Sequence, residues 1–391
     1  MISICIIAKN EEKNIGRCLE SFSNLKLELI VVDTGSTDRT CDIASKYTDK
    51  LYHYEWCDDF SKAKNFAVSK ASNRWVCVID ADEYLEEKSR KTISEIDGTL
   101  LNKSDMIGRI KRINLLEEGK NSEWINRIFD REKFSYEGRI HEQLRNISGE
   151  DYKSFKTDIT IIHTGYLLPM EERIKKANRN IRLLGEELKL ISADRETNKD
   201  RETDEGTKDR ETDEGGKDRE TDKDRECRKE EESKEAYLLY QLGKSYYFIK
   251  DYDKACEAFA AGLSFDLNPK LEYVIDMVET NGYAMINSGR AADALSYENI
   301  YEEFGYNADF DFLMGLIYMN NELYDKAVEY FLRAGKYADC RMEGVNSYLA
   351  FYNAAVVCDV LGRKDEAINY YEHCASYDKA MNRLEEIRKD I

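Results

Sequence analysis

Residues 75–83 read WVCVIDADE, an apolar run that ends in three closely spaced carboxylates, Asp80, Asp82 and Glu83. A short run that is apolar nearly throughout is typical of a strand buried on both faces of a parallel sheet. Carboxylates this close repel one another unless a cation shares them, and Mg²⁺ and Mn²⁺ prefer hard oxygen ligands. The stretch therefore predicts a core strand with a metal site at its carboxyl end.

The surrounding sequence extends this strand into a sheet. Three β-rich runs with helical patterns between them precede it, at residues 2–9, 27–34 and 51–56. Alternation of strands and helices predicts a mostly parallel, Rossmann-like α/β sheet with helices on both faces. Weaker β-rich pieces follow at residues 106–114, 127–131 and 158–164. We expect these later pieces to form a mixed extension of the same sheet.

Polar residues follow the first two apolar runs at the point where each run ends. Asn10 and Glu11 come after the first run, and Asp33 and Ser36 close the second. Ligands of open α/β sheets bind beyond the carboxyl ends of the strands, so these side chains should share a crevice with the carboxylates of residues 80–83. The alternative for Asp33 and Ser36 is a plain strand-to-helix turn with a serine or threonine cap.

Composition excludes several classes of protein. The formal net charge of −19 argues against binding to nucleic-acid backbones, which attract basic faces. No stretch approaches the roughly 20 apolar residues of a membrane-spanning helix. The apolar run at residues 2–8 lacks the basic lead and cleavage site of a signal peptide, and the ten cysteines include no CxxC pair. We therefore expect a cytoplasmic protein with reduced thiols and no transmembrane segment.

A charged repeat separates two parts of the chain. Residues 194–226 repeat the motif DRETDEGTK with small variations and offer no large apolar residue for burial. Such a segment cannot form its own core, and we expect a disordered or fraying helical insert. A functional charged segment is the alternative. The predicted organisation is an α/β domain at 1–192, a charged linker at 193–234 and a helical domain at 235–391.

The C-terminal part carries a recurring pattern of small and aromatic residues. Identical offsets separate the members of two sets, Gly243, Tyr246, Ala255 and Phe259 in the first and Gly315, Tyr318, Ala327 and Phe331 in the second. The spacing resembles the tetratricopeptide repeat, in which small residues let paired helices approach. With weaker copies included, the alanine positions 255, 294, 327 and 367 are 39, 33 and 40 residues apart. We therefore expect four helix pairs in an all-α solenoid, some with inserts.

Four stretches of the N-terminal part together resemble family 2 glycosyltransferases of the GT-A fold: AKNEE at 8–12, VVDTGSTD at 31–38, DFSKAKN at 59–65 and DADE at 80–83. The resemblance covers residues 1 to about 190. It is nearest to bacterial lipopolysaccharide-core glucosyltransferases and peptide S-glycosyltransferases, some of which also carry helical repeats. It implies inverting transfer of a sugar from a nucleotide-sugar donor, expected to be a UDP-sugar, with Mg²⁺ or Mn²⁺ as cofactor.

The resemblance also implies a donor pocket, formed by Ala8, Asn10, Glu11, Asp33, Lys64, Asp80 and Ala81. Asp33 would accept hydrogen bonds from the base or ribose, and Asp80 would face the ribose or the metal. Asp82 would bind the metal directly. Lys64 stands where related sequences often have arginine and would offset the charge of the diphosphate. The alternative for Lys64 is a solvated lysine on a helix.

Residues 136–144, YEGRIHEQL, match the acceptor-side segment of the same family. The match implies that Glu142 is the catalytic base, because inverting transfer needs a carboxylate that deprotonates the acceptor. Glu137 is the alternative base, and a surface salt bridge is the plain interpretation of either residue. His163 resembles the C-terminal metal-binding histidine of the fold. It could instead be a core histidine, and His141 could exchange roles with it.

Two other functions compete with glycosyl transfer. A nucleotidyltransferase would also use a metal and a phosphate crevice, but the sequence lacks a glycine-rich phosphate loop near the first strand. The chain could also be a scaffold whose repeats recruit partners while the α/β domain is inactive. For an active enzyme, we expect the repeats to bind a peptide or protein acceptor, or to form a homodimer, and a glycan or lipid acceptor is the alternative.

Overall fold

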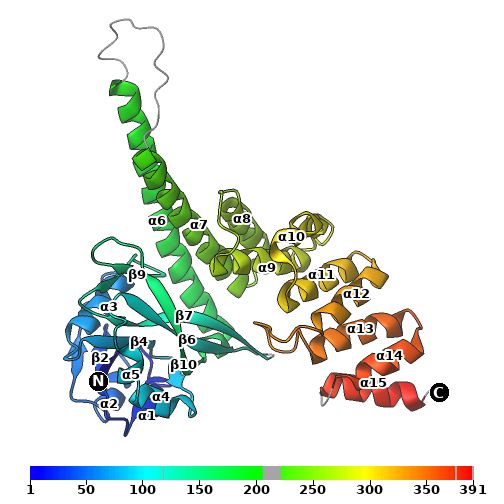
Figure 1. Ribbon diagram of the computed structural model, residues 1–391, viewed down its shortest axis with the longest axis horizontal. Coiled ribbons are helices and arrows are strands. Elements are labelled where there is room, and N and C mark those ends of the chain that lie inside the picture. The colour runs from blue at the N-terminus through cyan, green and yellow to red at the C-terminus, as the bar shows by residue number, and fades with distance from the viewer. Residues whose placement is uncertain (118, 206–221, 375–376, 390–391) are drawn as a thin grey trace, which may run out of the picture. The chain divides into compact units, whose positions relative to one another are not determined.

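The chain packs as two units in the computed structural model, Met1–Pro169 and Met170–Ile391 (Figure 1). The structure describes residues 1–117, 119–205, 222–374 and 377–389. Within these residues no helix is both long and apolar enough to cross a membrane.

Two long helices begin the second unit, α6 (Met170–Glu205) and α7 (Asp222–Phe248). The domain limits predicted at 192 and 234 fall within these helices and stay predictions. Within the charged insert predicted between those limits, the residues up to 205 belong to α6 and those from 222 onward belong to α7. Its central part, residues 206–221, lies outside the described residues.

The first unit is built on an eight-stranded sheet with the order β3-β2-β1-β4-β7-β6-β10-β5. Its strands are β1 (Ile2–Ala8), β2 (Glu28–Asp33), β3 (Leu51–His53), β4 (Trp75–Asp80), β5 (Glu83–Leu85), β6 (Met106–Leu115), β7 (Lys120–Asp130) and β10 (Lys153–His163). Strands β3, β2, β1 and β4 are mutually parallel, β6 is parallel to β10, and β7 and β5 run against their neighbours. The predicted mostly parallel sheet with a mixed extension is thus confirmed.

Helices and a hairpin cover the two faces of this sheet. The elements are α1 (Ile15–Phe22), α2 (Thr40–Ala44), α3 (Phe60–Ser69), α4 (Ser89–Ser94), α5 (Asp97–Leu100) and the hairpin strands β8 (Phe134–Glu137) and β9 (Gln143–Asn146). Side chains alternate along a strand, so Ile4 of β1 packs in the core that contains α1, while the adjacent Cys5 packs with α3 and the hairpin. Burial on both faces accounts for the apolar strand sequences.

Strand register brings the strand ends to one edge of the sheet. Ala8 of β1 pairs with Asp33 of β2, and Ile7 of β1 pairs with Asp80 of β4. Asp33 in turn pairs with His53 at the end of β3. The polar residues that follow these strands therefore start from neighbouring positions, which is the arrangement that open α/β sheets use for ligand sites.

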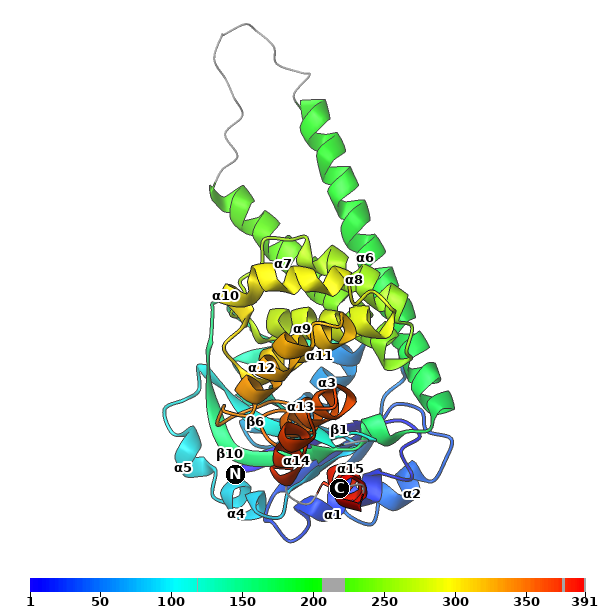
Figure 2. The same ribbon diagram turned by 90° about the vertical axis from the view of Figure 1, so that its right-hand side faces the viewer.

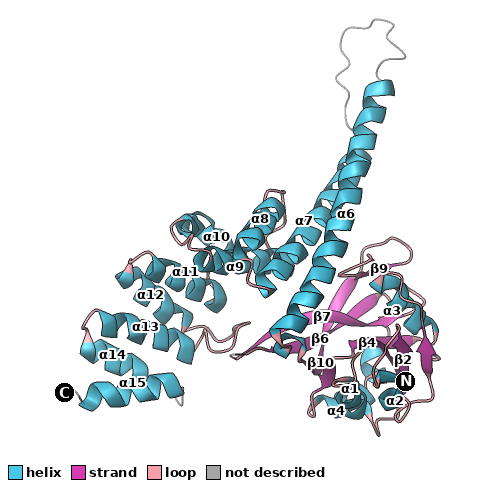
Figure 3. Ribbon diagram, turned by 180° about the vertical axis from the view of Figure 1, so that it is seen from behind, coloured by secondary structure: helices cyan, strands magenta, loops and turns pink. Residues whose placement is uncertain are grey.

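The regular elements of the second unit, in its described residues, are all helices, in contrast to the strands of the first (Figure 3). After α7 its elements are α8 (Tyr252–Leu263), α9 (Glu272–Asn287), η2 (Asp293–Ile300), α10 (Tyr301–Phe304), α11 (Ala308–Asn320), α12 (Tyr324–Ala334), α13 (Tyr348–Val360), α14 (Lys364–Glu372) and α15 (Asp378–Lys389). Figure 2 shows these helices stacked in chain order. A single hydrophobic core runs through the stack, and the predicted all-α solenoid is confirmed.

The small positions of the repeat pattern are sites of close helix approach. A Cβ atom added to Gly315 of α11 would lie 2.6 Å from the ring of Phe331 on α12. A Cβ on Gly243 of α7 would lie 2.5 Å from the ring of Phe259 on α8. Both phenylalanines are fully buried. The glycine therefore makes room for the aromatic ring, as the sequence pattern predicts.

We expect Gly315→Ala to lower the free energy of unfolding of the helical unit by about 1–3 kcal/mol, because overpacking forces the neighbouring ring or backbone to shift. Gly185→Ala is the matched control. Gly185 also lies in a helix, but a Cβ there would meet no atom within 4 Å. Alanine should stabilise that site by about 0.5–1 kcal/mol through helix propensity. Chemical denaturation followed by circular dichroism measures the free energy of unfolding of each variant. Equal changes in the two variants would contradict this role for Gly315.

A polar cluster ties the amino ends of the strands together. Glu28 at the start of β2 accepts hydrogen bonds from the side chains of Ser3 and Lys50 and, at 2.9 Å, from the main-chain N–H of Ser72. Burial would raise the pKa of Glu28, but these bonds outweigh it and lower the pKa to about 2. The ionised carboxylate therefore stabilises the folded state.

A lowered folded-state pKa predicts that this stabilisation is complete above the ordinary glutamate pKa of about 4.5 and disappears as the pH falls toward 2. We expect Glu28→Gln to cost about 2–3 kcal/mol of unfolding free energy at pH 7. The difference between wild type and variant should shrink steadily between pH 4.5 and pH 2. Denaturant titrations at several pH values measure it, and a constant difference down to pH 2.5 would rule out this assignment.

Candidate functional site

Two loops interlock at the carboxyl edge of the sheet, beyond β1 and β2. The Asn10 side-chain oxygen accepts a hydrogen bond from the main-chain N–H of Thr37 at 2.8 Å, and the main-chain N–H of Asn10 donates to Ser36 Oγ at 2.9 Å. The main-chain N–H of Glu11 donates to Thr40 Oγ1 at 2.7 Å. Asn10 and Glu11 thus hold the two predicted pocket loops together as a single polar rim.

Asp33 lies buried below this rim and faces a turn of the main chain. Its carboxylate accepts hydrogen bonds from the N–H groups of Gly35 and Ser36, each at 3.1 Å. Gly35 has a φ of 99°, a conformation that glycine adopts without strain. Burial would raise the pKa of Asp33, but the bonds from Ser36 and Gly35 outweigh it and lower the pKa. Asp33 is therefore an ionised acceptor, and the exposed His53 lies 3.4 Å from it.

Lys64 points from α3 into the site and is only 5% exposed. Its Nζ lies 3.2 Å from Asp80 Oδ1 and 2.6 Å from Glu142 Oε1. Burial would lower the pKa of this lysine, but the two carboxylates outweigh that effect and raise it. The alternative of a solvated lysine is therefore wrong. Lys64 is a charged group that bridges two acids from distant parts of the sequence.

The hairpin β8–β9 presents Glu142 to Lys64. The Asn65 side chain, next to Lys64 on α3, exchanges two hydrogen bonds of 2.9 Å with the main chain of Tyr136 on β8. The main-chain carbonyl of Arg139 accepts a further bond of 2.8 Å from Phe60 at the start of α3. The hairpin is thus fastened to the helix that carries the lysine.

The structure separates the two candidate bases within this hairpin. The Glu142 side chain is 11% exposed and ion-paired with Lys64, whereas Glu137 at the end of β8 is exposed. His141 adjoins Glu142 in the connection between the strands, with a φ of 50°. Of the two acids, Glu142 is therefore the one that lies beside Lys64, which also contacts Asp80.

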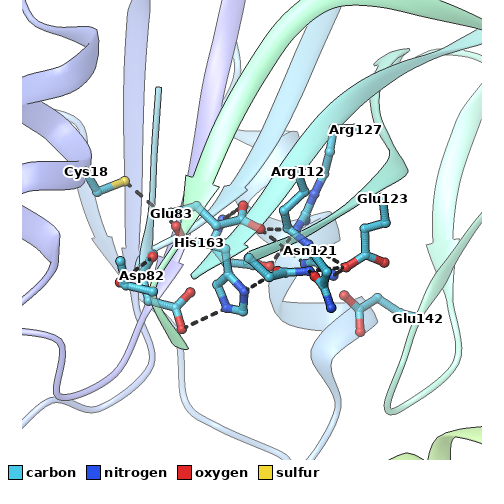
Figure 4. Close-up of polar contacts among 12 residues, drawn as sticks. Cys18, Asp82, Glu83, Arg112, Asn121, Glu123, Arg127, Glu142 and His163 are labelled. Carbon is cyan, nitrogen blue, oxygen red and sulfur yellow. Dashed lines mark hydrogen bonds and ion pairs between the residues drawn. The ribbon is translucent and has the colours of Figure 1, made fainter. Parts of the chain in front are cut away.

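Two arginines complete the balance of the acidic charges at the end of β4. Neither was among the site residues predicted from the sequence. Arg127 of β7 lies 2.6 Å from Asp80 Oδ2 and 3.0 Å from Glu83 Oε1, and Arg112 of β6 lies 3.3 Å from the same Glu83 oxygen. Burial raises the pKa of Asp80, but Arg127 and Lys64 hold it well below its ordinary value. Figure 4 shows both arginines beside Glu83. Protein cations therefore balance Asp80 and Glu83, and the metal site predicted at this strand end stays a prediction.

Asp82 faces His163. Asp82 Oδ2 lies 3.5 Å from His163 Nε2, and both side chains are largely buried. His163 Nδ1 lies 2.7 Å from Asn114 Oδ1. The Asn114 amide nitrogen donates to Asn121 and Glu123, each at 2.8 Å, which identifies the oxygen as the atom that faces the histidine. His163 therefore donates from Nδ1 to Asn114 and directs Nε2 toward Asp82 (Figure 4).

This pair fits a divalent cation. A carboxylate oxygen and an imidazole nitrogen are suitable ligands for Mn²⁺, and a carboxylate partner suits Mg²⁺. The contact from Asn114 to His163 fixes the tautomer that a metal ligand requires. Gly165 keeps the space beside the pair open, since a Cβ there would lie 2.5 Å from His163 Nε2 and 2.6 Å from Asp82 Oδ2. Ala81, between Asp80 and Asp82, is buried and small.

Comparison with known proteins gives a family match within each unit. Residues 3–141 match the model of glycosyl transferase family 2, and residues 229–269, 312–337 and 348–381 match that of the tetratricopeptide repeat. The family resemblance inferred from the sequence is thus confirmed for the matched parts of the chain.

Curated relatives each match a part of the chain. The chain is 30% identical over 200 residues to the SPbeta prophage-derived glycosyltransferase SunS of Bacillus subtilis. The aligned region covers 48% of this chain and 45% of SunS. It is 35% identical over 99 residues to the lipopolysaccharide core biosynthesis glycosyltransferase LpsC of Rhizobium meliloti, or 24% of this chain and 36% of LpsC. A TPR repeat-containing protein of Synechococcus elongatus is 48% identical over 84 residues, or 22% and 21% of the two chains. The chain spans less than half the length of each.

The space that Gly165 leaves yields a prediction about metal binding. We expect Gly165→Ala to lower the affinity for Mn²⁺ at least about tenfold, because the added methyl group would push His163 and Asp82 away from the ligand geometry. Isothermal titration calorimetry with Mn²⁺ measures the change. Gly98→Ala is the control, since a Cβ there meets no atom within 4 Å, and it should bind Mn²⁺ like wild type. Unchanged affinity in Gly165→Ala would exclude the Asp82–His163 pair as the metal site.

Proposed function

We propose that this chain, whose N-terminal unit carries a family 2 glycosyltransferase domain, is an inverting glycosyltransferase that uses a UDP-sugar and one divalent cation. The observation that supports this most directly is the position of Lys64 between Asp80 and Glu142. One buried cation there connects the end of the donor strand to a carboxylate on the acceptor-side hairpin. Donor departure and acceptor activation can therefore be coupled through a single side chain.

The nucleoside would bind at the rim formed by the loops after β1 and β2. Asp33 is held ionised and accepts hydrogen bonds, which suits an N–H of the base or a hydroxyl of the ribose. Ala8 and Ala81 are small and buried at the ends of β1 and β4. Asn10 and Glu11 fix the loop above them, so the pocket is formed before the donor arrives.

The diphosphate would lie between Lys64 and the Asp82–His163 pair. Mg²⁺ or Mn²⁺ bound by Asp82 and His163 would supply positive charge to the leaving diphosphate. Lys64 adds a second positive charge from the other side of Asp80. Asp82 and His163 would hold the cation where negative charge develops on the leaving group, and Lys64 would turn to the diphosphate once the donor is bound.

Glu142 would act as the base. It takes the proton from the acceptor as the acceptor atom bonds to the anomeric carbon, while the bond from that carbon to the diphosphate oxygen breaks and the nucleoside diphosphate leaves. In the free protein Glu142 is paired with Lys64. A bound diphosphate competes for that lysine and releases the carboxylate toward the acceptor. The base thus becomes available when the donor is in place.

The helical unit would supply the acceptor or its carrier. Tetratricopeptide-like stacks present an extended surface that suits peptides and proteins. We therefore propose a peptide or protein acceptor that is bound by the second unit, in line with the resemblance to peptide S-glycosyltransferases. A homodimer formed through the same helices is the alternative use of this surface.

The screen that tests this function measures metal-dependent release of nucleoside diphosphate from UDP-glucose, UDP-GlcNAc, UDP-galactose and GDP-mannose. We expect one donor to be hydrolysed, with water replacing the acceptor. Asp82→Asn should reduce the rate at least about 100-fold through the loss of a metal ligand. Glu142→Gln should reduce kcat by roughly 10²- to 10⁴-fold while donor affinity is retained.

Glu137→Gln is the matched control for the base, since it makes the same change on the same hairpin at an exposed residue. It should leave the rate within about twofold of wild type. An undiminished rate in Glu142→Gln would refute the assignment of the base. Inertness toward every donor, in protein shown to be folded, would favour an inactive scaffold, and pyrophosphate release from nucleoside triphosphates would favour nucleotidyl transfer.

A further inference from the structure

The connection between α12 and α13, residues 335–347, is unusually long for this helical stack. The corresponding step from α10 to α11 takes only residues 305–307. The difference accounts for the 40-residue spacing between Ala327 and Ala367, against 33 in the preceding repeat. In Figure 1 the connection appears in orange as a loop that leaves the stacked helices. The extra residues allow this segment to reach back to earlier repeats.

Arg341 in this connection contacts three acids on two earlier helices. Its guanidinium pairs with Glu279 of α9 and lies 3.9 Å from Asp276 of the same helix. The main-chain N–H groups of Arg341 and Met342 donate to the Asp309 carboxylate of α11 at 2.8 and 2.9 Å. The pocket thus binds both the side chain and the adjoining backbone of one arginine, as it would bind an arginine within a peptide.

The acids of this pocket need a positive partner. The pKa of Asp309 is raised by burial and further by the nearby Asp276. Lys244 and Tyr240 of α7 contact Asp276, each at 2.6 Å, and despite the burial of Asp276 the charges of Lys244 and Arg341 lower its pKa. Buried like charges without a counter-charge are costly. With Asp276 paired to Lys244, it is Glu279 and Asp309 that are complementary to a cation and N–H donors entering from outside the helices.

Arg341 occupies the pocket incompletely. The Glu279 side chain is 8% exposed, and its Oε1 has no hydrogen-bond partner among the described residues. Arg341 itself is 39% exposed, so it enters from the surface and is not part of the core. A guanidinium can form two parallel bonds with one carboxylate, and Arg341 leaves one acceptor of Glu279 unused. Another arginine with a freer backbone could use both oxygens.

We propose that Asp276, Glu279 and Asp309 form a binding site for an arginine-containing segment of a partner peptide, and that Arg341 occupies this site as an internal competitor until the partner arrives. The inference rests on the proposed peptide-binding role of the helical unit, but binding at this site does not require sugar transfer. It specifies the acceptor or carrier as a peptide with an arginine flanked by accessible main-chain N–H groups.

The connection itself supplies a probe. A fluorescent peptide with the sequence of residues 336–343, KYADCRME, carries the arginine in its own backbone context. Fluorescence anisotropy with the full chain, without donor or metal, measures its affinity. We expect the Arg341→Ala chain to bind this peptide at least about tenfold more tightly than wild type, because the internal competitor is gone. The same peptide with citrulline in place of arginine should bind at least about tenfold more weakly, since it lacks the charge.

Glu279→Gln in the Arg341→Ala background should abolish the gain in affinity. Equal affinity of wild type and Arg341→Ala, or equal binding of the arginine and citrulline peptides, would overturn the proposal. If Arg341→Ala does not fold, hydrogen exchange on the wild-type chain decides instead: saturating arginine peptide should accelerate exchange of the amides of residues 341 and 342, and unchanged exchange would overturn the proposal. Donor hydrolysis is measured separately, so failure here leaves the glycosyltransferase assignment intact.

Discussion

The structure of the first unit depends on how it accommodates carboxylates at the end of a buried strand. Asp80 and Glu83 follow the apolar β4, where unpaired charges would be strongly unfavourable. Arg127 and Lys64 pair with Asp80. Arg127 and Arg112 both pair with Glu83. These cations come from α3, β6 and β7, so the site can form only when the whole sheet and the covering helix are in place. Folding and the assembly of the charged site are therefore the same event.

This requirement explains the mixed half of the sheet. The parallel strands β1, β2 and β4 provide the edge proposed to bind the nucleotide but no basic side chain for the acids. Strand β7 enters between β4 and β6 and places Arg127 next to Asp80, while β10 brings His163 to Asp82. The mixed half of the sheet thus supplies charge balance to the acids and the histidine that we propose as a metal ligand. It is part of the chemistry of the site as well as of its architecture.

Sequence patterns predicted features that depend on local periodicity or on motifs close in the chain. The apolar runs gave the strands and their shared edge, and the spacing from Gly315 to Phe331 gave the close helix approach. Arg127 was missed because a charged residue in a β-rich run is ordinarily assigned to the exposed face, and its partner lies 47 residues away. The available signal was an arginine inside the β-rich stretch WINRIF, followed directly by two large apolar residues. The Arg341 pocket, which joins separate repeats, left no local signal at all.

Both units balance buried acids with basic side chains, but the origin of the cation differs. In the first unit Arg127 and Arg112 lie on strands within a packed sheet, where displacement would break the sheet itself. In the second unit Arg341 lies on a long connection, and its removal from the pocket need not unstack a helix. Loops carry exchangeable contacts more readily than sheets do because fewer packed neighbours hold them. Lys64 lies between these cases: its helix is fixed, but its long flexible side chain can move from Glu142 to an incoming diphosphate. The mobility of each cation thus indicates whether an acid is balanced for stability or held ready for a ligand.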